Sequence, residues 1–133
     1  MNPSKRMIIL LNLCWFVVLY GIIVAANYGM LEFIATLAKT IPWFDKFGHF
    51  ILYGGLAFLS SLSLNKTYFC LREWRITEGM LLVLLLATIE ELTQLYNTHR
   101  SFDSLDMLVN ILAVLSFGYL AQMLIGRRRF LGQ

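Results

Sequence analysis

The sequence predicts an all-α integral membrane protein: a four-helix bundle with both termini cytoplasmic and a short interfacial helix in the first outer loop. Three observations predict this fold class. Of the 133 residues, 59% are hydrophobic and only 14% are charged, whereas soluble domains carry about 25% charged residues. Four apolar runs come close to the ~20 residues that cross a bilayer. The connections between them are short, which favours antiparallel neighbours within a single domain, 1–133.

The first span is predicted at about residues 7–26. It follows Lys5 and Arg6, and its apolar run is longer than the roughly 7–15 residues of a signal peptide core. Residues 30–38 place apolar side chains at helical spacing, which predicts the short interfacial helix, ended by Pro42. The remaining spans are predicted at about residues 46–64, 76–96 and 104–125.

Orientation follows from the Lys and Arg residues at each end of the spans, because cytoplasmic loops are enriched in them. Of the 11 such residues, all but three lie at the end that holds the termini, which predicts cytoplasmic termini in a multi-pass protein of the inner membrane. The three at the outer end are Lys39, Lys46 and Arg100. Despite the net charge of +3, the basic residues form no face for a phosphate backbone, so no nucleic-acid partner is expected.

Polar residues interrupt the apolar runs at the outer end. They open the second span, close the third and open the fourth, and the polar residues of each group share one helix face. Ionisable groups cost several kcal/mol in hydrocarbon, so their concentration at one depth predicts a site. The candidates are Asp45, Lys46, His49, Tyr53, Glu90, Glu91, Gln94, Arg100, Asp103, Asp106 and Asn110.

Their chemistry suggests roles. The candidate catalytic residues are one histidine and three carboxylates. The imidazole titrates near neutral pH. Two carboxylates held close together repel, which raises the pKa of one of them and yields a general acid beside a general base. Substrate binding is assigned to the other candidates, with Lys46 and Arg100 for a phosphate or carboxylate. A divalent cation is compatible with the nitrogen and oxygen ligands of Asp45, His49, Asp106 and one glutamate, but the sequence leaves the cofactor open. The catalytic set is His49, Glu90, Glu91 and Asp106.

A purely structural alternative remains open. Polar side chains between membrane helices often form hydrogen bonds that contribute about 0.6 kcal/mol each. The pairs that this alternative predicts are Asp45–Lys46, Arg100 with Glu90 or Glu91, and Asp106–Asn110. Because the group contains five carboxylates, more than such bonding needs, we favour a functional pocket.

Three motifs resemble the VanZ-like family of small membrane proteins: DKFGHFILY (residues 45–53), EELTQ (90–94) and RSFDSLDMLVN (100–110). The resemblance covers about residues 42–118. Family members often have a glycine three residues after the asparagine, where this chain has Ala113. The resemblance implies a protein of the cell envelope, linked to glycopeptide (teicoplanin) susceptibility through the family's founding member. It implies no agreed reaction.

Three functions compete. The protein acts on or binds a phosphate- or sugar-bearing lipid precursor of the cell envelope, with membrane lipid as its partner. Alternatively, it is a non-catalytic accessory or scaffold protein of an envelope complex. A proton-coupled carrier is the third hypothesis, since carriers use intramembrane carboxylates. It ranks lowest because the inner half lacks matching polar groups and inverted repeats are absent.

Overall fold

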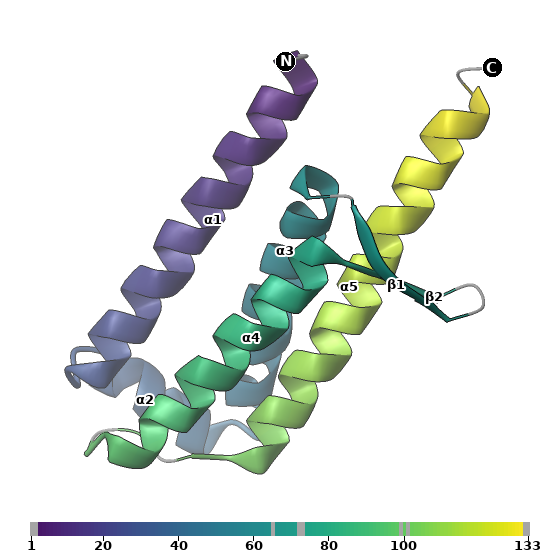
Figure 1. Ribbon diagram of the computed structural model, residues 1–133. Helices are drawn as coiled ribbons and strands as arrows, with labels where there is room; N and C mark the ends of the chain where they lie inside the picture. Colours follow the sequence, from purple (N-terminus) through teal and green to yellow (C-terminus); the bar gives the residue numbers. More distant parts are fainter. Residues whose placement is uncertain (1–2, 65, 72–73, 99, 101, 132–133) are drawn as a thin grey trace.

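The computed structural model describes residues 3–64, 66–71, 74–98, 100 and 102–131. Most of the described chain is helical, and a two-stranded hairpin lies between the third and fourth helices (Figure 1). The elements in chain order are α1 (Pro3–Asn27), α2 (Glu32–Thr40), α3 (Phe44–Ser63), β1 (Thr67–Leu71), β2 (Trp74–Thr77), α4 (Glu78–Thr93), a 3-10 turn (Gln94–Tyr96) and α5 (Ser104–Leu131).

Helix α3 holds the fold together. It packs against α1, α4 and α5, and its largest interface is with α5, which is not its neighbour in sequence. Tyr53 and Ala57 of α3 are buried together with Leu19 of α1, Val83 of α4 and Val114 of α5. The start of α1 and the end of α5 lie at the same end of the molecule (Figure 1).

Three helical segments are long and apolar enough to cross a membrane: Ser4–Asn27, Glu78–Tyr96 and Ser104–Gly126. They agree closely with three of the four predicted spans. Helix α3 has 20 residues and is therefore about 30 Å long. It falls outside this set because its first turns carry Asp45, Lys46 and His49. Three candidate spans indicate a membrane protein.

A hairpin replaces the start of the predicted third span, which corrects the all-α expectation. Strand β1 pairs antiparallel with β2, so residues 76 and 77 belong to a strand and α4 begins at Glu78. Thr77 ends the strand and caps the helix, since its Oγ1 accepts a hydrogen bond from Met80 N at 3.2 Å. A threonine at this position satisfies one of the free N–H groups of a helix start.

Glycines permit the closest helix contacts. A Cβ built on Gly79 of α4 would lie 2.4 Å from the carbonyl carbon of Ser60 in α3. On the other side of α3, a Cβ on Gly55 would meet the ring of Trp15, whose Nε1 donates to Leu52 O at 2.9 Å. Ala113 of α5 is fully buried. Small side chains thus allow α1, α4 and α5 to pack close together around α3.

A short helix is present where the sequence predicts one, as α2. Two residues with positive φ lie beside it, Gly29 at 69° and Trp43 at 67°. A left-handed conformation is uncommon for a tryptophan, and Trp43 adopts it immediately before α3 begins. These two turns return the chain beneath α1 and direct the first residues of α3 towards the ends of α4 and α5 (Figure 1). Arg72, one of the residues in the orientation count, lies outside the described residues.

Candidate functional site

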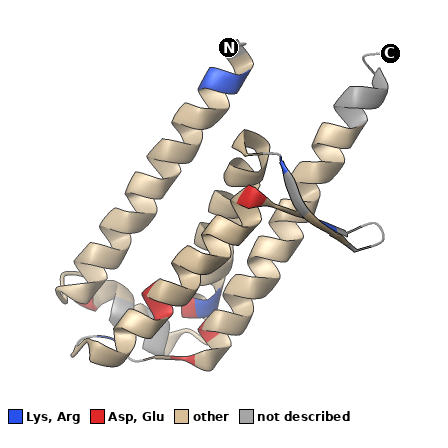
Figure 2. Cartoon of the chain, viewed as in Figure 1, with Lys and Arg blue, Asp and Glu red and all other residues tan. Residues whose placement is uncertain are grey.

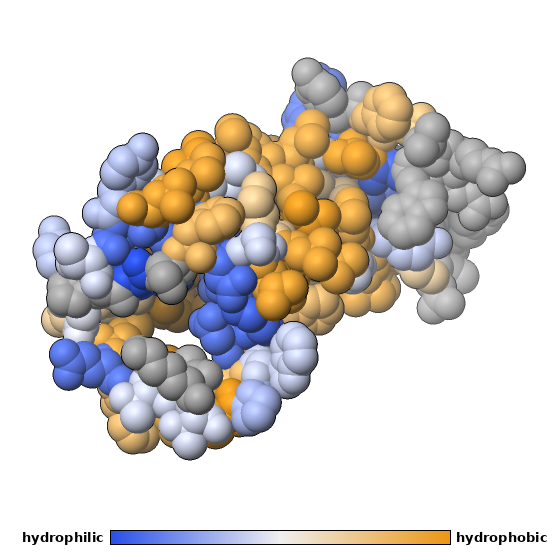
Figure 3. Space-filling model, turned by 90° about the horizontal axis from the view of Figure 1, so that it is seen from below, coloured by the Kyte–Doolittle hydropathy of each residue, from blue (hydrophilic) through white to orange (hydrophobic). Residues whose placement is uncertain are grey.

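Acidic residues, together with basic ones, gather at the end of the molecule opposite the termini (Figure 2), here called the polar end. Seen from below, hydrophilic residues border a hollow at this end (Figure 3). All eleven candidate residues from the sequence are described and lie here in two groups. The Lys46 cluster contains Asp45, Lys46, His49, Asp103, Asp106 and Asn110, and the Glu90 cluster contains Tyr53, Glu90, Glu91, Gln94 and Arg100.

The Lys46 cluster joins α3 to α5. Lys46 Nζ lies 2.5 Å from Asp103 Oδ2 and 2.6 Å from Asp106 Oδ1, and 3.5 Å from Asp45 Oδ2. His49 is buried, and its Nδ1 lies 3.2 Å from Asn110 Oδ1. One ammonium therefore lies within 3.5 Å of three carboxyl groups.

The Glu90 cluster joins α4 to α3 and to the connection before α5. Glu90 Oε2 accepts a hydrogen bond from Tyr53 Oη at 3.1 Å, and its Oε1 accepts one from Gln94 Nε2 at 3.0 Å. Arg100 forms an ion pair with the same Oε1. Glu91 is fully buried and accepts from Gln94 Nε2 at 3.3 Å. Both glutamates are thus held in place through several donors, as buried carboxylates require.

Asp103 connects the two clusters. Its backbone N–H donates to Glu91 Oε1 at 2.9 Å, and its carboxylate receives the Lys46 ammonium. It also accepts from Leu105 N at 2.9 Å in the first turn of α5. The hydrogen bond from Lys46 holds the pKa of Asp103 below its usual value of 3.8. Asp103 thus fixes the start of α5 against the ends of α3 and α4.

The lowered pKa of Asp103 predicts acid sensitivity. Because the folded pKa lies below the unfolded value near 3.8, the stabilisation is complete above that value and is lost as pH falls through the folded pKa. The effect is modest, since the side chain is 37% exposed and solvent screens the pair. We expect the unfolding temperature in detergent to fall as the pH is lowered below about 4, with a shallower slope for Asp103→Asn. An equal slope for this variant would contradict the assignment.

The structural pairs that the sequence suggested form only in part. Arg100 pairs with Glu90, as predicted. Lys46 is closer to Asp103 and Asp106 than to its neighbour Asp45. Asn110 contacts His49 and not Asp106, and its buried Nδ2 has no hydrogen-bond partner among the described residues.

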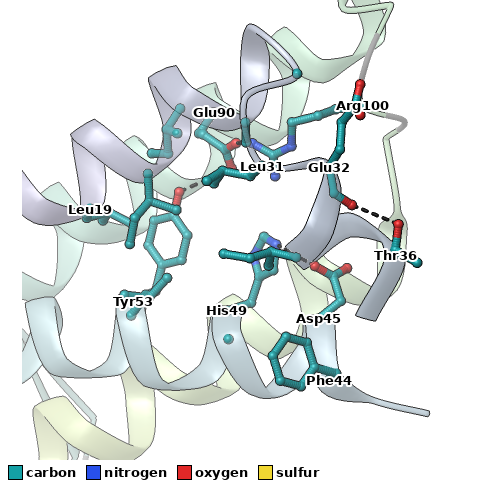
Figure 4. Close-up of a pocket in the computed structure, with 17 residues that line it drawn as sticks. Leu19, Leu31, Glu32, Thr36, Phe44, Asp45, His49, Tyr53, Glu90 and Arg100 are labelled. Atoms are coloured by element: carbon teal, nitrogen blue, oxygen red, sulfur yellow. Dashed lines mark hydrogen bonds and ion pairs between the residues drawn. The ribbon is translucent and has the colours of Figure 1, made fainter. Parts of the chain in front are cut away.

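A pocket of about 470 Å³ opens beside the two clusters. Apolar residues of α1, among them Leu19, Ile23 and Ala26, form one wall. Figure 4 shows Asp45, His49 and Tyr53 of α3 side by side, with Glu90 and Arg100 across from them. His49 and Tyr53 stack with their ring centroids 5.9 Å apart. The pocket is therefore apolar along α1, and its polar groups come from α3 and from Glu90 and Arg100.

Part of this pocket could not be anticipated from the sequence. Glu32 and Thr36 of α2 line it together with the wall of α1. The amphipathic pattern predicted that α2 exists, but no spacing in the sequence shows that it folds back beneath α1 and beside α3. Lys46, expected to face a ligand, is directed towards α5 and is not among the residues that line the pocket.

Comparison with protein-family models, with curated proteins and with solved structures finds no match to this chain.

Proposed function

We propose that the protein is a multi-pass protein of the inner membrane whose pocket binds the sugar- or phosphate-bearing headgroup of a cell-envelope lipid. In this proposal α3 is a fourth span, the termini are cytoplasmic and the polar end faces outward. The observation that carries the proposal is the division of the pocket into an apolar wall and a charged side. A lipid is the class of ligand that presents both surfaces at once.

The position of the wall favours entry from the bilayer. Helix α1 packs mainly against α3. Only 6% of its most apolar 18-residue stretch is buried within the protein. Most of its surface is thus available to lipid, while Leu19 and Ala26 turn towards the pocket. A hydrocarbon chain that lies along α1 would keep its headgroup at the level of His49 and Tyr53.

The charges favour a headgroup rich in hydroxyls. The pocket is lined by the carboxylates of Glu32, Asp45 and Glu90 and by one guanidinium, that of Arg100. Carboxylates accept hydrogen bonds from sugar hydroxyls and repel a bare phosphate. Arg100 uses one N–H group for Glu90 and has five in all, so it can also bind one phosphate of a sugar phosphate.

The VanZ-like resemblance is part of the proposal. The three motifs that carry it, residues 45–53, 90–94 and 100–110, contain all eleven residues of the two clusters. Five of these eleven residues line the pocket: Asp45, His49, Tyr53, Glu90 and Arg100. The proposal concerns binding; if a chemical step follows, His49 is the group best placed for proton transfer, because both oxygens of Glu90 already accept hydrogen bonds.

The test is lipid retention by the purified full-length chain in detergent, measured by native mass spectrometry. The probes are a monoglucosyl diacylglycerol, phosphatidylglycerol and phosphatidylcholine with identical acyl chains. We expect the glycolipid to be retained best and phosphatidylcholine least. Ala26→Trp, which fills the pocket from α1, should reduce retention of the glycolipid at least tenfold.

Ala25 supplies the matched control, because it precedes Ala26 on the same helix and is not among the residues that line the pocket. Ala25→Trp should retain the glycolipid as the parent chain does. Equal retention of all three lipids, or an unchanged Ala26→Trp variant, would overturn the proposal. A change in the mass of the bound lipid with time would identify an enzyme, and an unchanged mass a binding protein.

A further inference from the structure

Three ligand atoms converge at the polar side of the pocket. His49 Nε2 lies 4.0 Å from Asp45 Oδ1 and 3.9 Å from Asp106 Oδ2, and one set of ligand atoms from these three residues lies within 4.8 Å of one another. These separations are too long for hydrogen bonds. They are slightly longer than the ~3.4 Å between two ligands of one tetrahedral ion, given metal–ligand distances of about 2.0–2.2 Å.

The other polar atoms of the three residues are already engaged. Lys46 interacts with the remaining oxygens, Asp106 Oδ1 at 2.6 Å and Asp45 Oδ2 at 3.5 Å. Asn110 Oδ1 lies 3.2 Å from His49 Nδ1; with the amide in this orientation Nδ1 carries the proton, and Nε2 keeps its lone pair. Each residue therefore directs one free ligand atom towards the same point, while its other polar atom is held by a neighbour.

Burial adds a second, independent observation. The side chains of His49 and Asp106 are only 10% and 6% exposed, yet among the described residues Asp106 Oδ1 and Asn110 Nδ2 are buried without a hydrogen-bond partner, and Oδ1 has only the Lys46 ammonium at 2.6 Å. Buried polar atoms are almost always partnered. In addition, Asp45, Asp103 and Asp106 share the single ammonium of Lys46, so the carboxyl groups around His49 outnumber the lysines. A divalent cation would give the buried carboxyl group a partner and would place positive charge beside the three carboxyl groups.

We propose that Asp45, His49 and Asp106 bind a divalent transition-metal ion, Zn²⁺ or Mn²⁺, and that Lys46 and Asn110 orient these ligands. One nitrogen and two carboxylate oxygens suit these ions better than Mg²⁺, which prefers oxygen ligands. Partners of this kind fix the tautomer of a metal-binding histidine and the orientation of its carboxylates. Asp45 and His49 also line the pocket, so an ion there would offset the charge that disfavours a phosphate.

This site goes beyond the lipid proposal and is tested without added lipid. The full-length chain in detergent is treated with chelator, and binding of Zn²⁺, Mn²⁺ and Mg²⁺ is followed by calorimetry and elemental analysis. We expect one equivalent of Zn²⁺ or Mn²⁺, bound at least tenfold more tightly than Mg²⁺, together with a higher unfolding temperature. Asn110→Leu should weaken binding by about 10–100-fold.

Two carboxylate-to-amide variants make the test specific. Asp45 is half exposed, so Asp45→Asn should fold normally and lose at least tenfold in affinity for the ion. Glu90→Gln changes a carboxylate that lines the same pocket but lies outside the three ligands, and it should bind the ion as the parent chain does. Equal losses in both variants, or no binding by the parent chain, would overturn the site. The second result would not affect the lipid proposal.

Discussion

Replacing Lys46 with methionine is expected to lower the free energy of unfolding by about 3 kcal/mol. Methionine keeps the unbranched apolar part of the side chain but removes the ammonium that Asp103 and Asp106 share at 2.5 and 2.6 Å. Asp106 is 4% exposed, and an ionised carboxylate that loses its partner in such a site is strongly destabilising. Unfolding in mixed detergent micelles measures the loss.

The chain supplies a control with the same substitution. Lys66 pairs with Glu78 at 3.3 Å near the other end of the molecule, with the lysine side chain 80% exposed. An exposed pair of this kind contributes about 0–1 kcal/mol, so Lys66→Met should have little effect. If the two variants lose similar stability, the ion pairs of Lys46 do not hold the polar end together.

The second large effect is expected for Gly79→Ala. The added Cβ would lie 2.4 Å from the Ser60 carbonyl carbon and 2.5 Å from its oxygen. These are backbone atoms of α3, so relief requires that α3 and α4 move apart. Such overpacking costs about 1–3 kcal/mol, measurable as a lower unfolding temperature in detergent.

Gly21 on α1 is the matched control, because a Cβ there meets nothing within 4 Å. Alanine favours a helix over glycine by about 1 kcal/mol, so Gly21→Ala should be neutral or slightly stabilising. A neutral Gly79→Ala variant would contradict the close contact between α3 and α4.

The hairpin shows where reasoning from the sequence failed. Residues 67–71 and 74–77 contain threonine, aromatic and isoleucine side chains, which favour strands. However, Ile76 and Thr77 continue directly into the apolar residues of α4, so a search for apolar runs assigns them to a span. Pairing between β1 and β2 satisfies the backbone groups of these residues, and a search for apolar runs does not reveal such pairing.

At the polar end, the sequence predicted where the residues lie but not how they pair. The sequence placed the eleven polar residues at one end, because they stand at matching ends of successive apolar runs. It did not determine which groups pair. Lys46 lies closer to Asp103, directly before α5, and to Asp106 in its first turn than to the adjacent Asp45, although they are 57 and 60 positions away. Pairing between neighbours in sequence is the simplest assumption, but the orientation of α3 directs Lys46 elsewhere.

By itself, then, the sequence determined the membrane character, the helices and the end of the molecule that carries the polar residues. These properties depend on composition and on the length of apolar runs, which are local along the chain. Only the tertiary structure decided that α3 is central, that α1 and α2 complete the pocket, and that His49 faces Asp45 and Asp106. These features depend on how the helices rotate and pack against one another. The helix packing is set by the close contacts at Gly55 and Gly79 together with the ion pairs between α3 and α5.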